Sequence, residues 1–330
     1  MRARLAPIAV AAALLAAGAG EPAAHWSITD PGQGPVPLPS GSSGARELSG
    51  ITWAGGTRYY AVSDKLGKLF PLSVEIDPHS GTITHAAVEP GVLLPGSTDL
   101  EGVAYDPEQA TVLVSDEIGP GIRAYRVAGG SPVRALALPP VYRNIRKNLS
   151  LEALSMDPEH RTLWTANEET LGIDGPRSSF TAGSVIRLQR FDRQYQPTGE
   201  WAYVTDPLFG DMLLRGYDLE RSGVSDLVAL SNGGLLALER GYGAGGLRIR
   251  LYEVDFRGAT DVAAVPSLAG ADYAPVHKTL RWQHMFPDIN YEGAALGPAL
   301  DGGAHSLVLI SDDGHQLRQT LYALSIRPAP

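Results

Sequence analysis

A pattern of two strands recurs five times along this chain and constrains the fold more than any other feature. In each copy, a short apolar strand leads through a turn into a second apolar strand, as in Leu100–Tyr105 followed by Val112–Glu117. The other copies begin at Leu48, Leu151, Ser225 and Tyr291. Two apolar strands joined by a short turn predict a buried β-hairpin.

Further strands of alternating polarity follow each hairpin, for example Phe70–Asp77 and Ile122–Val127. A repeated unit of four strands, apolar inside and alternating outside, is typical of a propeller blade. The sequence therefore predicts an all-β fold, a single β-propeller of four-stranded blades. Five blades are visible, and the long third and fourth repeats leave room for a sixth. We expect His25–Thr29 to supply the outer strand of the last blade; an ordinary β-sandwich is the alternative.

The first residues predict a secretory signal peptide over residues 1–19. Arg2 and Arg4 precede an apolar run from Leu5 to Ala17, and Ala17-Gly18-Ala19 matches a cleavage pattern of small residues. That run is short for a membrane span, and no later stretch reaches the ~18 apolar residues that a span needs. We therefore expect a periplasmic or secreted protein in which residues 25–330 form one propeller domain.

Composition excludes several classes of function. The 330 residues include no Cys, which excludes disulfides, thiolate zinc sites, iron–sulfur clusters and Cys nucleophiles. The formal net charge of −9 argues against nucleic-acid binding, which needs a basic surface. Phosphate-loop, G-x-S-x-G and H-E-x-x-H motifs are absent, and the 8 His have no ligand spacing. We expect a monomer that acts on a small molecule.

Acidic residues recur at two hairpin positions that should share one end of the propeller channel. The positions that open the first strand are Glu101, Glu152, Asp226 and Glu292, with Ser49 as the neutral exception. The positions that close the second strand are Asp64, Asp116/Glu117, Asn167/Glu168, Glu239 and Asp312/Asp313. Because these two strands are antiparallel, the start of one lies beside the end of the other. The acids should therefore gather at one channel mouth.

Close carboxylates repel each other by roughly 1–4 kcal/mol per pair, so a gathered set requires compensation. Ca²⁺ is the predicted cofactor because it tolerates irregular sets of oxygen ligands. The predicted metal ligands are Glu101, Asp116, Glu117, Glu152, Glu168, Asp226, Glu239, Glu292 and Asp312. The alternative is that these acids cap strand ends and accept backbone N–H groups.

Basic residues accompany the acids. Lys65 and Arg240 adjoin closing positions, and a loop with Arg143, Arg146 and Lys147 runs into Glu152. Such cations beside a metal site suit a phosphate ester, so these five residues are the predicted phosphate contacts. A solvated surface loop is the alternative for residues 143–147.

Six segments resemble the bacterial phytase-like family, propeller proteins described as having an esterase-like activity of phytase. They are Leu48-Ser49-Gly50, residues 99–106, Leu151-Glu152-Ala153-Leu154, residues 223–227, Leu238-Glu239-Arg240-Gly241 and Asn290-Tyr291-Glu292-Gly293. The resemblance covers about residues 45 to 326 and implies a β-propeller, an extracytoplasmic location and a phosphoester or ester substrate. The chain departs from the pattern at Ser49, which is not an acid, and at Ala153, where a glycine follows the other glutamates, Glu101 and Glu292.

Three functions remain open. In a Ca²⁺-dependent phosphoester hydrolase, Glu101, Glu152 or Glu292 would accept a proton from water, assisted by Arg240 or Lys65. A Ca²⁺-dependent lactonase or carboxylic esterase would need one cation and no arginine for phosphate. A ligand-binding propeller with structural calcium would catalyse nothing.

Overall fold

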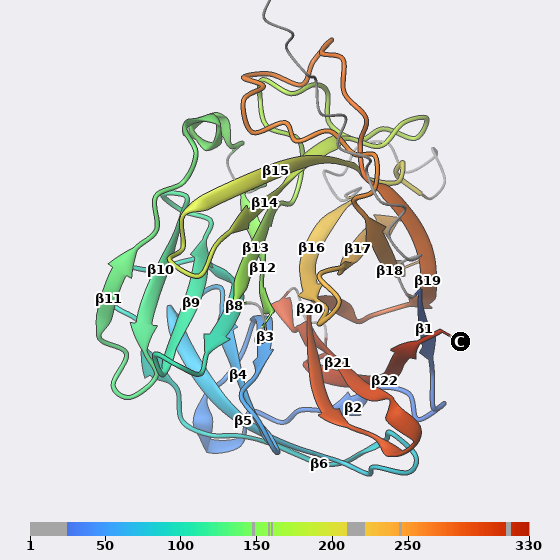
Figure 1. Ribbon diagram of the computed structural model, residues 1–330. Helices are drawn as coiled ribbons and strands as arrows, with labels where there is room; N and C mark the ends of the chain where they lie inside the picture. The colour runs from blue at the N-terminus through green and yellow to red at the C-terminus, as the bar shows by residue number, and fades with distance from the viewer. Residues whose placement is uncertain are drawn as a thin grey trace, which may run out of the picture.

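The computed structural model describes residues 25–146, 149–157, 159, 161–209, 222–243, 246–314 and 318–329. The predicted signal peptide and Lys147 lie outside the described residues. In the described part, antiparallel strands form five sheets arranged around a common centre, which confirms the all-β propeller (Figure 1). None of the described helices has the length and apolarity to cross a membrane.

Each sheet is one blade, and we number the blades in the order of their innermost strands. Blade I contains β3 (Leu48–Trp53), β4 (Arg58–Ser63), β5 (Lys68–Ile76), β6 (Ile83–Val88) and the short β7 (Val92–Leu93). Blade II contains β8 (Leu100–Asp106), β9 (Thr111–Asp116), β10 (Gly121–Arg126) and β11 (Pro132–Ala135). Blade III contains β12 (Leu151–Asp157), β13 (Thr162–Asn167), β14 (Val185–Phe191) and β15 (Pro197–Val204).

Blade IV contains β16 (Ser222–Ala229), β17 (Leu235–Gly243), β18 (Gly246–Asp255) and β19 (His277–Phe286). Blade V contains β20 (Asn290–Ala299), β21 (His305–Asp312), β22 (Thr320–Pro328), β1 (Trp26–Thr29) and the short β2 (Val36–Pro37). Short 3₁₀ turns span Gly41–Ser43, Pro140–Asn144 and Asp301–Gly303.

Blade V closes the ring with strands from both ends of the chain. β1 pairs antiparallel with β22, from Trp26 opposite Pro328 to Thr29 opposite Ser325. The predicted role of His25–Thr29 is confirmed, with the strand beginning one residue later. Hydrogen bonds between the two ends replace a covalent connection and hold the first and last blades together.

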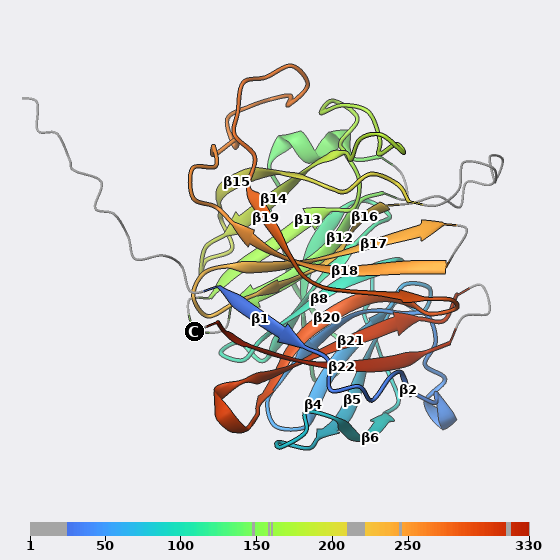
Figure 2. The same ribbon diagram turned by 90° about the vertical axis from the view of Figure 1, so that its right-hand side faces the viewer.

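The extra length of the third and fourth repeats forms no sixth sheet among the described residues. It forms loops at residues 168–184 and 256–276, which lie together outside blades III and IV (Figure 2). Arg187 on β14 is fully buried and holds Asp174 of the first loop through Nε and Nη2, at 2.6 and 2.8 Å. The same carboxylate accepts the backbone N–H of Leu268 in the second loop. One buried ion pair therefore anchors both loops.

The core lies between neighbouring blades rather than within one of them. One apolar cluster joins Leu48 and Phe70 of blade I to Val308, Ile310 and Leu321 of blade V. The inner strands are buried on both faces, and all eight residues of β16 are buried. Burial of this apolar surface fixes the blades around the channel, so side chains at equivalent positions of the inner strands converge on the axis.

A candidate metal site at the channel mouth

All five inner strands carry a β-bulge at the same level. The ladder to the second strand shifts register between Leu48/Ile51, Leu100/Val103, Leu151/Ala153, Val224/Asp226 and Tyr291/Gly293. A bulge leaves a residue unpaired and re-aims its side chain. The residues at these shifts include Ser49, Glu101, Glu152, Ser225 and Glu292. The acid position of each repeat is thus a bulge position.

The glycine that follows three of these residues is required by close packing of neighbouring backbones. A Cβ on Gly102 would lie 2.5 Å from the carbonyl oxygen of Glu152 in the next inner strand. Gly50 and Gly293 meet the carbonyl oxygens of Glu101 and Ser49 in the same way. Because a real Cβ does not approach a carbonyl oxygen so closely, only glycine fits.

The bulge corrects the predicted alignment of blade IV by one residue. Ser225 occupies the acid position there, and Asp226 occupies the position of the glycine. The carboxylate of Asp226 accepts the backbone N–H groups of Leu227 and Ala294 at 2.8 Å and that of Leu154 at 3.4 Å. Asp226 therefore ties β16 to β12 and β20, and these contacts favour a link between three blades over its predicted role as a metal ligand.

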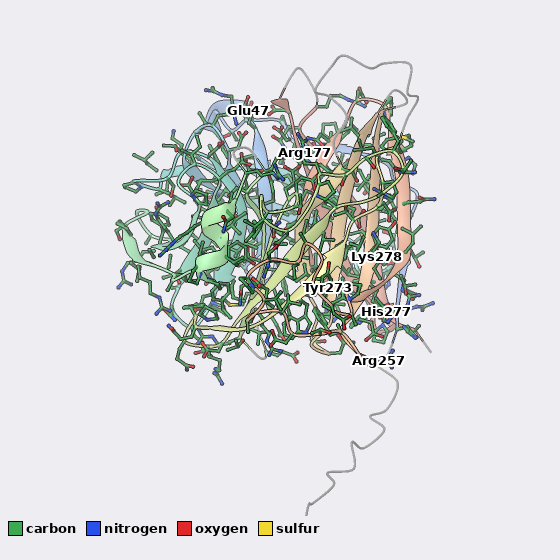
Figure 3. All side chains as sticks on the ribbon, turned by 90° about the horizontal axis from the view of Figure 1, so that it is seen from above. Glu47, Arg177, Arg257, Tyr273, His277 and Lys278 are labelled. Carbon is green, nitrogen blue, oxygen red and sulfur yellow. The ribbon has the colours of Figure 1, made fainter. Side chains whose placement is uncertain are left out.

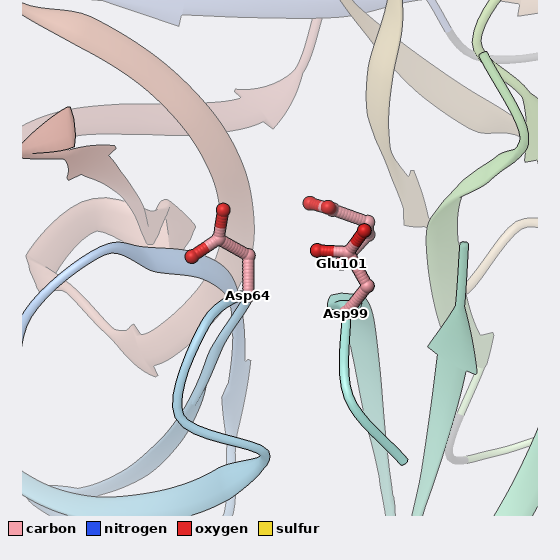
Figure 4. A group of neighbouring side chains, drawn as sticks. All are labelled: Asp64, Asp99 and Glu101. Atoms are coloured by element: carbon pink, nitrogen blue, oxygen red, sulfur yellow. The ribbon is translucent and has the colours of Figure 1, made fainter. Parts of the chain in front are cut away.

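Five carboxylates form two groups that share Glu101. Oxygens of Asp64, Asp99 and Glu101 lie within 4.8 Å of one another, and so do oxygens of Glu101, Glu117 and Glu152. Figure 4 shows the first group, in which Asp64 follows β4 while Asp99 and Glu101 come from the start of β8. Asp64 was predicted at the mouth but not as a ligand, and Asp99 was not predicted at all. Its position two residues before Glu101, on the same side of an extended chain, is the signal that could have found it.

Burial makes this cluster electrostatically costly. Glu101 is 9% exposed and Glu152 is 5% exposed. Burial raises the pKa of both carboxyls well above the ordinary value, and the charge of Glu292 on Glu101, and of Glu101 on Glu152, raises them further. Burial also raises the pKa of Glu117 to about 7 and that of Asp64 to about 6. The cluster therefore favours protons or cations.

Glu152 differs from the other acids because its carboxylate accepts no hydrogen bond from the described residues. Glu101 accepts a hydrogen bond from the hydroxyl of Ser49 at 2.5 Å, and Glu117 accepts the backbone N–H of Ser150 at 3.1 Å. The charge of Arg240 offsets part of the cost at Glu152, but a buried carboxylate without a hydrogen-bond donor is unfavourable unless something else binds it. Glu152 thus marks the part of the mouth that best suits a ligand.

Arg240 neutralises a different part of the mouth. Its Nη2 lies 3.0 Å from Oε1 of Glu168, and its Nη1 donates to Glu292. Burial disfavours the charge of Arg240, but the carboxylates of Glu292 and Glu168 outweigh it and hold the guanidinium pKa above its ordinary value. Burial, together with the charge of Glu292, raises the pKa of nearby Asp312 to about 8. These predicted residues are brought together, with Arg240 as their internal counter-ion.

Two further predicted ligands lie away from these groups. Glu239 is buried against Tyr203 and Lys278, whose side chains donate to Oε1 at 2.6 and 2.5 Å. Asp116 accepts a 2.8 Å hydrogen bond from Arg123. Successive side chains of a strand point to opposite faces, so Glu239 faces blade III while Arg240 faces the axis. Both acids already have protein counter-ions, Lys278 and Arg123, so their role as metal ligands stays a prediction that these contacts do not favour.

The predicted phosphate contacts also include residues that reach the channel mouth and residues that lie elsewhere. Lys65 reaches the mouth, where Nζ lies 2.6 Å from Oδ2 of Asp64 and 3.2 Å from Oδ1 of Asp99. Arg146 instead donates to the backbone carbonyls of Thr170 and Gly175, and so braces a loop. Arg143 is exposed on its 3₁₀ turn.

A family model described as phytase-like, with esterase-like activity of phytase, matches residues 43–315. This match spans every blade. The chain belongs to the phytase-like family. The predicted family is therefore confirmed, while its named activity remains a separate question, since fold and function are not equivalent.

Solved structures similar to this phytase-like protein are distant in sequence. A PQQ-bound aldose sugar dehydrogenase from Streptomyces coelicolor is 14% identical, with a TM-score of 0.43, over 92% of this chain and 99% of that one. A calcium-binding regucalcin from Agrobacterium tumefaciens is 13% identical, with a TM-score of 0.41, over 92% and 96%. A Kuenenia stuttgartiensis hydrazine synthase is 11% identical, with a TM-score of 0.39, over 88% of this chain and 66% of that one. No curated protein matches the sequence significantly.

Proposed function

We propose that this phytase-like protein is an exported, Ca²⁺-dependent phosphoester hydrolase whose channel mouth binds the cation and the substrate. The observation that carries the proposal is Glu152, a buried carboxylate that faces Glu101 and Glu117 and has no hydrogen-bond donor among the described residues. The predicted signal peptide supports export to the periplasm or the medium.

The donor set fits calcium. The groups around Glu101 offer only carboxylate oxygens, which hard divalent cations prefer, and they come from separate loops and bulges rather than from one rigid motif. When bound, Ca²⁺ would attract phosphate oxygens and lower the pKa of a coordinated water.

Three glutamates at the mouth were predicted to accept a proton from water, and they differ in whether they already accept hydrogen bonds. Glu292 is engaged by Arg240 and by the side-chain amide of Asn290, at 2.6 Å for the amide. Glu101 is engaged by Ser49. Glu152 is the acid left to accept a proton from an attacking water, because its carboxylate accepts no hydrogen bond from the described residues and lies beside Glu101 and Glu117.

A Ca²⁺-dependent lactonase or carboxylic esterase is the second candidate, and the state of Arg240 favours it. Both terminal nitrogens of this guanidinium already bind carboxylates, so Lys65 is the remaining predicted cation at the mouth for a phosphate. A neutral ester needs fewer such groups.

Hydrolysis of a phosphomonoester, a lactone and an acyl ester, each with calcium and with chelator, tests the proposal. We expect calcium-dependent release of phosphate, competitive inhibition by inorganic phosphate, and a loss of at least tenfold in kcat/KM for Glu152→Gln. Glu159→Gln, at an exposed position beyond the other end of β12, is the matched control. Turnover of the lactone or acyl ester alone would transfer the assignment to the second candidate. Binding of calcium without any turnover would leave a ligand-binding propeller.

A further inference from the structure

Two cationic side chains already lie on the acids of the mouth, and they differ in how firmly they are held. Arg240 is 17% exposed and grips Glu168 and Glu292 with both terminal nitrogens. Lys65 is 57% exposed and reaches Asp64 and Asp99 through one ammonium group. A planar guanidinium fork keeps its geometry, whereas an ammonium on a four-carbon stem is readily rehydrated. Lys65 is therefore the cation that can leave.

The ammonium of Lys65 lies on the acids that a metal would use. Asp64 and Asp99 belong to the group whose oxygens lie within 4.8 Å of Glu101. Glu101 also belongs to the group of Glu152, whose carboxylate has no hydrogen-bond donor among the described residues. A single positive charge cannot balance this set of carboxylates, and a divalent cation is attracted about twice as strongly at the same distance. The two cations must then compete for the same oxygens.

We infer that Lys65 is a displaceable counter-ion, which a divalent cation bound by Asp64, Asp99 and Glu101 replaces. The ammonium neutralises these acids while the metal is absent. Once displaced, it stands in solvent beside the cation, where it attracts a negatively charged substrate. The inference rests on the proposed cation site. It adds Asp64 and Asp99 as ligands of the cation, and it adds Lys65 as a charged group that is released only when the metal binds.

Calcium titration of the full-length protein by calorimetry tests the competition. Lys65→Met removes the competitor, and we expect calcium to bind at least about fivefold more tightly, because one charge a few ångström away has at least this effect. Arg257→Met is the matched control, since Arg257 is an exposed cation that pairs with Asp255 at 2.7 Å. Figure 3 shows Arg257 on the opposite side of the molecule from Glu47, whose carbonyl accepts the N–H of Asp64. Equal or weaker binding by Lys65→Met overturns the inference.

Chemical acetylation of the unaltered protein gives an independent measurement. An amine engaged by two carboxylates reacts slowly, so calcium should raise the acetylation of Lys65, read by peptide mass spectrometry, by at least about threefold. Lys68 and Lys278 serve as internal references and should not change. If calcium binds but Lys65 reacts no faster and Lys65→Met binds no tighter, the inference alone is wrong. If calcium changes neither heat nor reactivity in any variant, the proposed cation site fails and the inference fails with it.

Discussion

The hydroxyl of Ser49 donates a 2.5 Å hydrogen bond to Oε2 of Glu101, which lies 52 residues further along the chain. The two residues occupy the same bulge position in neighbouring blades. Ser49 stands at a position where other blades carry an acid. It therefore donates a hydrogen bond to Glu101 and adds no negative charge to the mouth.

Replacement of Ser49 by alanine should weaken calcium binding. Hydrogen bonds to charged groups contribute about 1.5–3 kcal/mol, so we expect a loss of about tenfold or more in calcium affinity at pH 7. The loss should shrink as pH rises, because the Ser49 hydrogen bond lowers the pKa of Glu101 and a higher pH ionises the carboxyl in its absence. Ser225→Ala is the control, because Ser225 holds the equivalent position in blade IV but its hydroxyl donates to the carbonyl of Leu238 at 3.4 Å. Equal effects in the two variants would contradict this role.

Replacement of Glu152 by glutamine should have opposite effects on metal binding and on the metal-free fold. The change keeps the shape of the side chain but removes a carboxyl that burial and the charge of Glu101 make costly to ionise. We expect calcium affinity to fall at least about tenfold, while the metal-free protein becomes more stable. Urea unfolding in chelator and calcium titration measure the two quantities. Unchanged calcium affinity would remove Glu152 from the site.

The stability of the metal-free protein should fall as pH rises. Burial raises the pKa values of Asp64, Glu117 and Asp312 to about 6, 7 and 8. The folded state therefore binds more protons than the unfolded state at pH values between about 4 and 8, and stability decreases across that window. We expect a loss of roughly 2 kcal/mol or more between pH 5 and pH 8 in chelator.

Calcium should reverse this trend, because a bound cation favours the ionised carboxylates. Melting temperatures at pH 5, 6, 7 and 8, with calcium and with chelator, provide the measurement, and the two curves should diverge as pH rises. Parallel curves would show that these acids do not bind the ion.

Arg240→Lys should destabilise the fold. Lysine retains the charge but is shorter and has one ammonium in place of two terminal nitrogens, so it loses the two-armed contact with Glu168 and Glu292. We expect the free energy of unfolding in chelator to fall by about 2–3 kcal/mol. Arg257→Lys, at an exposed ion pair, should leave it essentially unchanged. If Arg240→Lys leaves the free energy of unfolding unchanged, the paired contacts of the guanidinium with Glu168 and Glu292 do not stabilise the mouth.

Asp226→Asn tests the corrected alignment of blade IV. All three partners of this side chain are N–H donors, and an asparagine would turn its own amide group toward one of them. We expect a loss of about 1–3 kcal/mol in stability, with calcium affinity unchanged in the folded protein. A stable variant with weakened calcium binding would restore Asp226 to the ligand set.

The architecture could be predicted from the sequence because it depends on local patterns. Apolar hairpins such as Leu100–Asp116 repeat along the chain, and each repeat needs a neighbour to cover its apolar faces. The closing strand at Trp26–Thr29 could also be predicted, since the last blade lacked an outer strand. The sixth blade was open in the sequence because the length of a repeat does not reveal whether the excess forms strands or loops such as 256–276.

The sequence by itself determined that acids recur at one end of a propeller channel, and it identified Glu101, Glu152 and Arg240. Only the tertiary structure decided which acids meet. A single bulged residue shifts the side-chain alternation of a strand, so Ser225 and Asp226 exchange roles that no local pattern distinguishes. The partners of Glu239 and Asp99, Tyr203 and Lys65, come from the neighbouring blades and are brought near by the packing of one blade on the next. Whether a carboxylate becomes a cation ligand or half of an ion pair depends on those distant neighbours, because charge interactions act through space rather than along the chain.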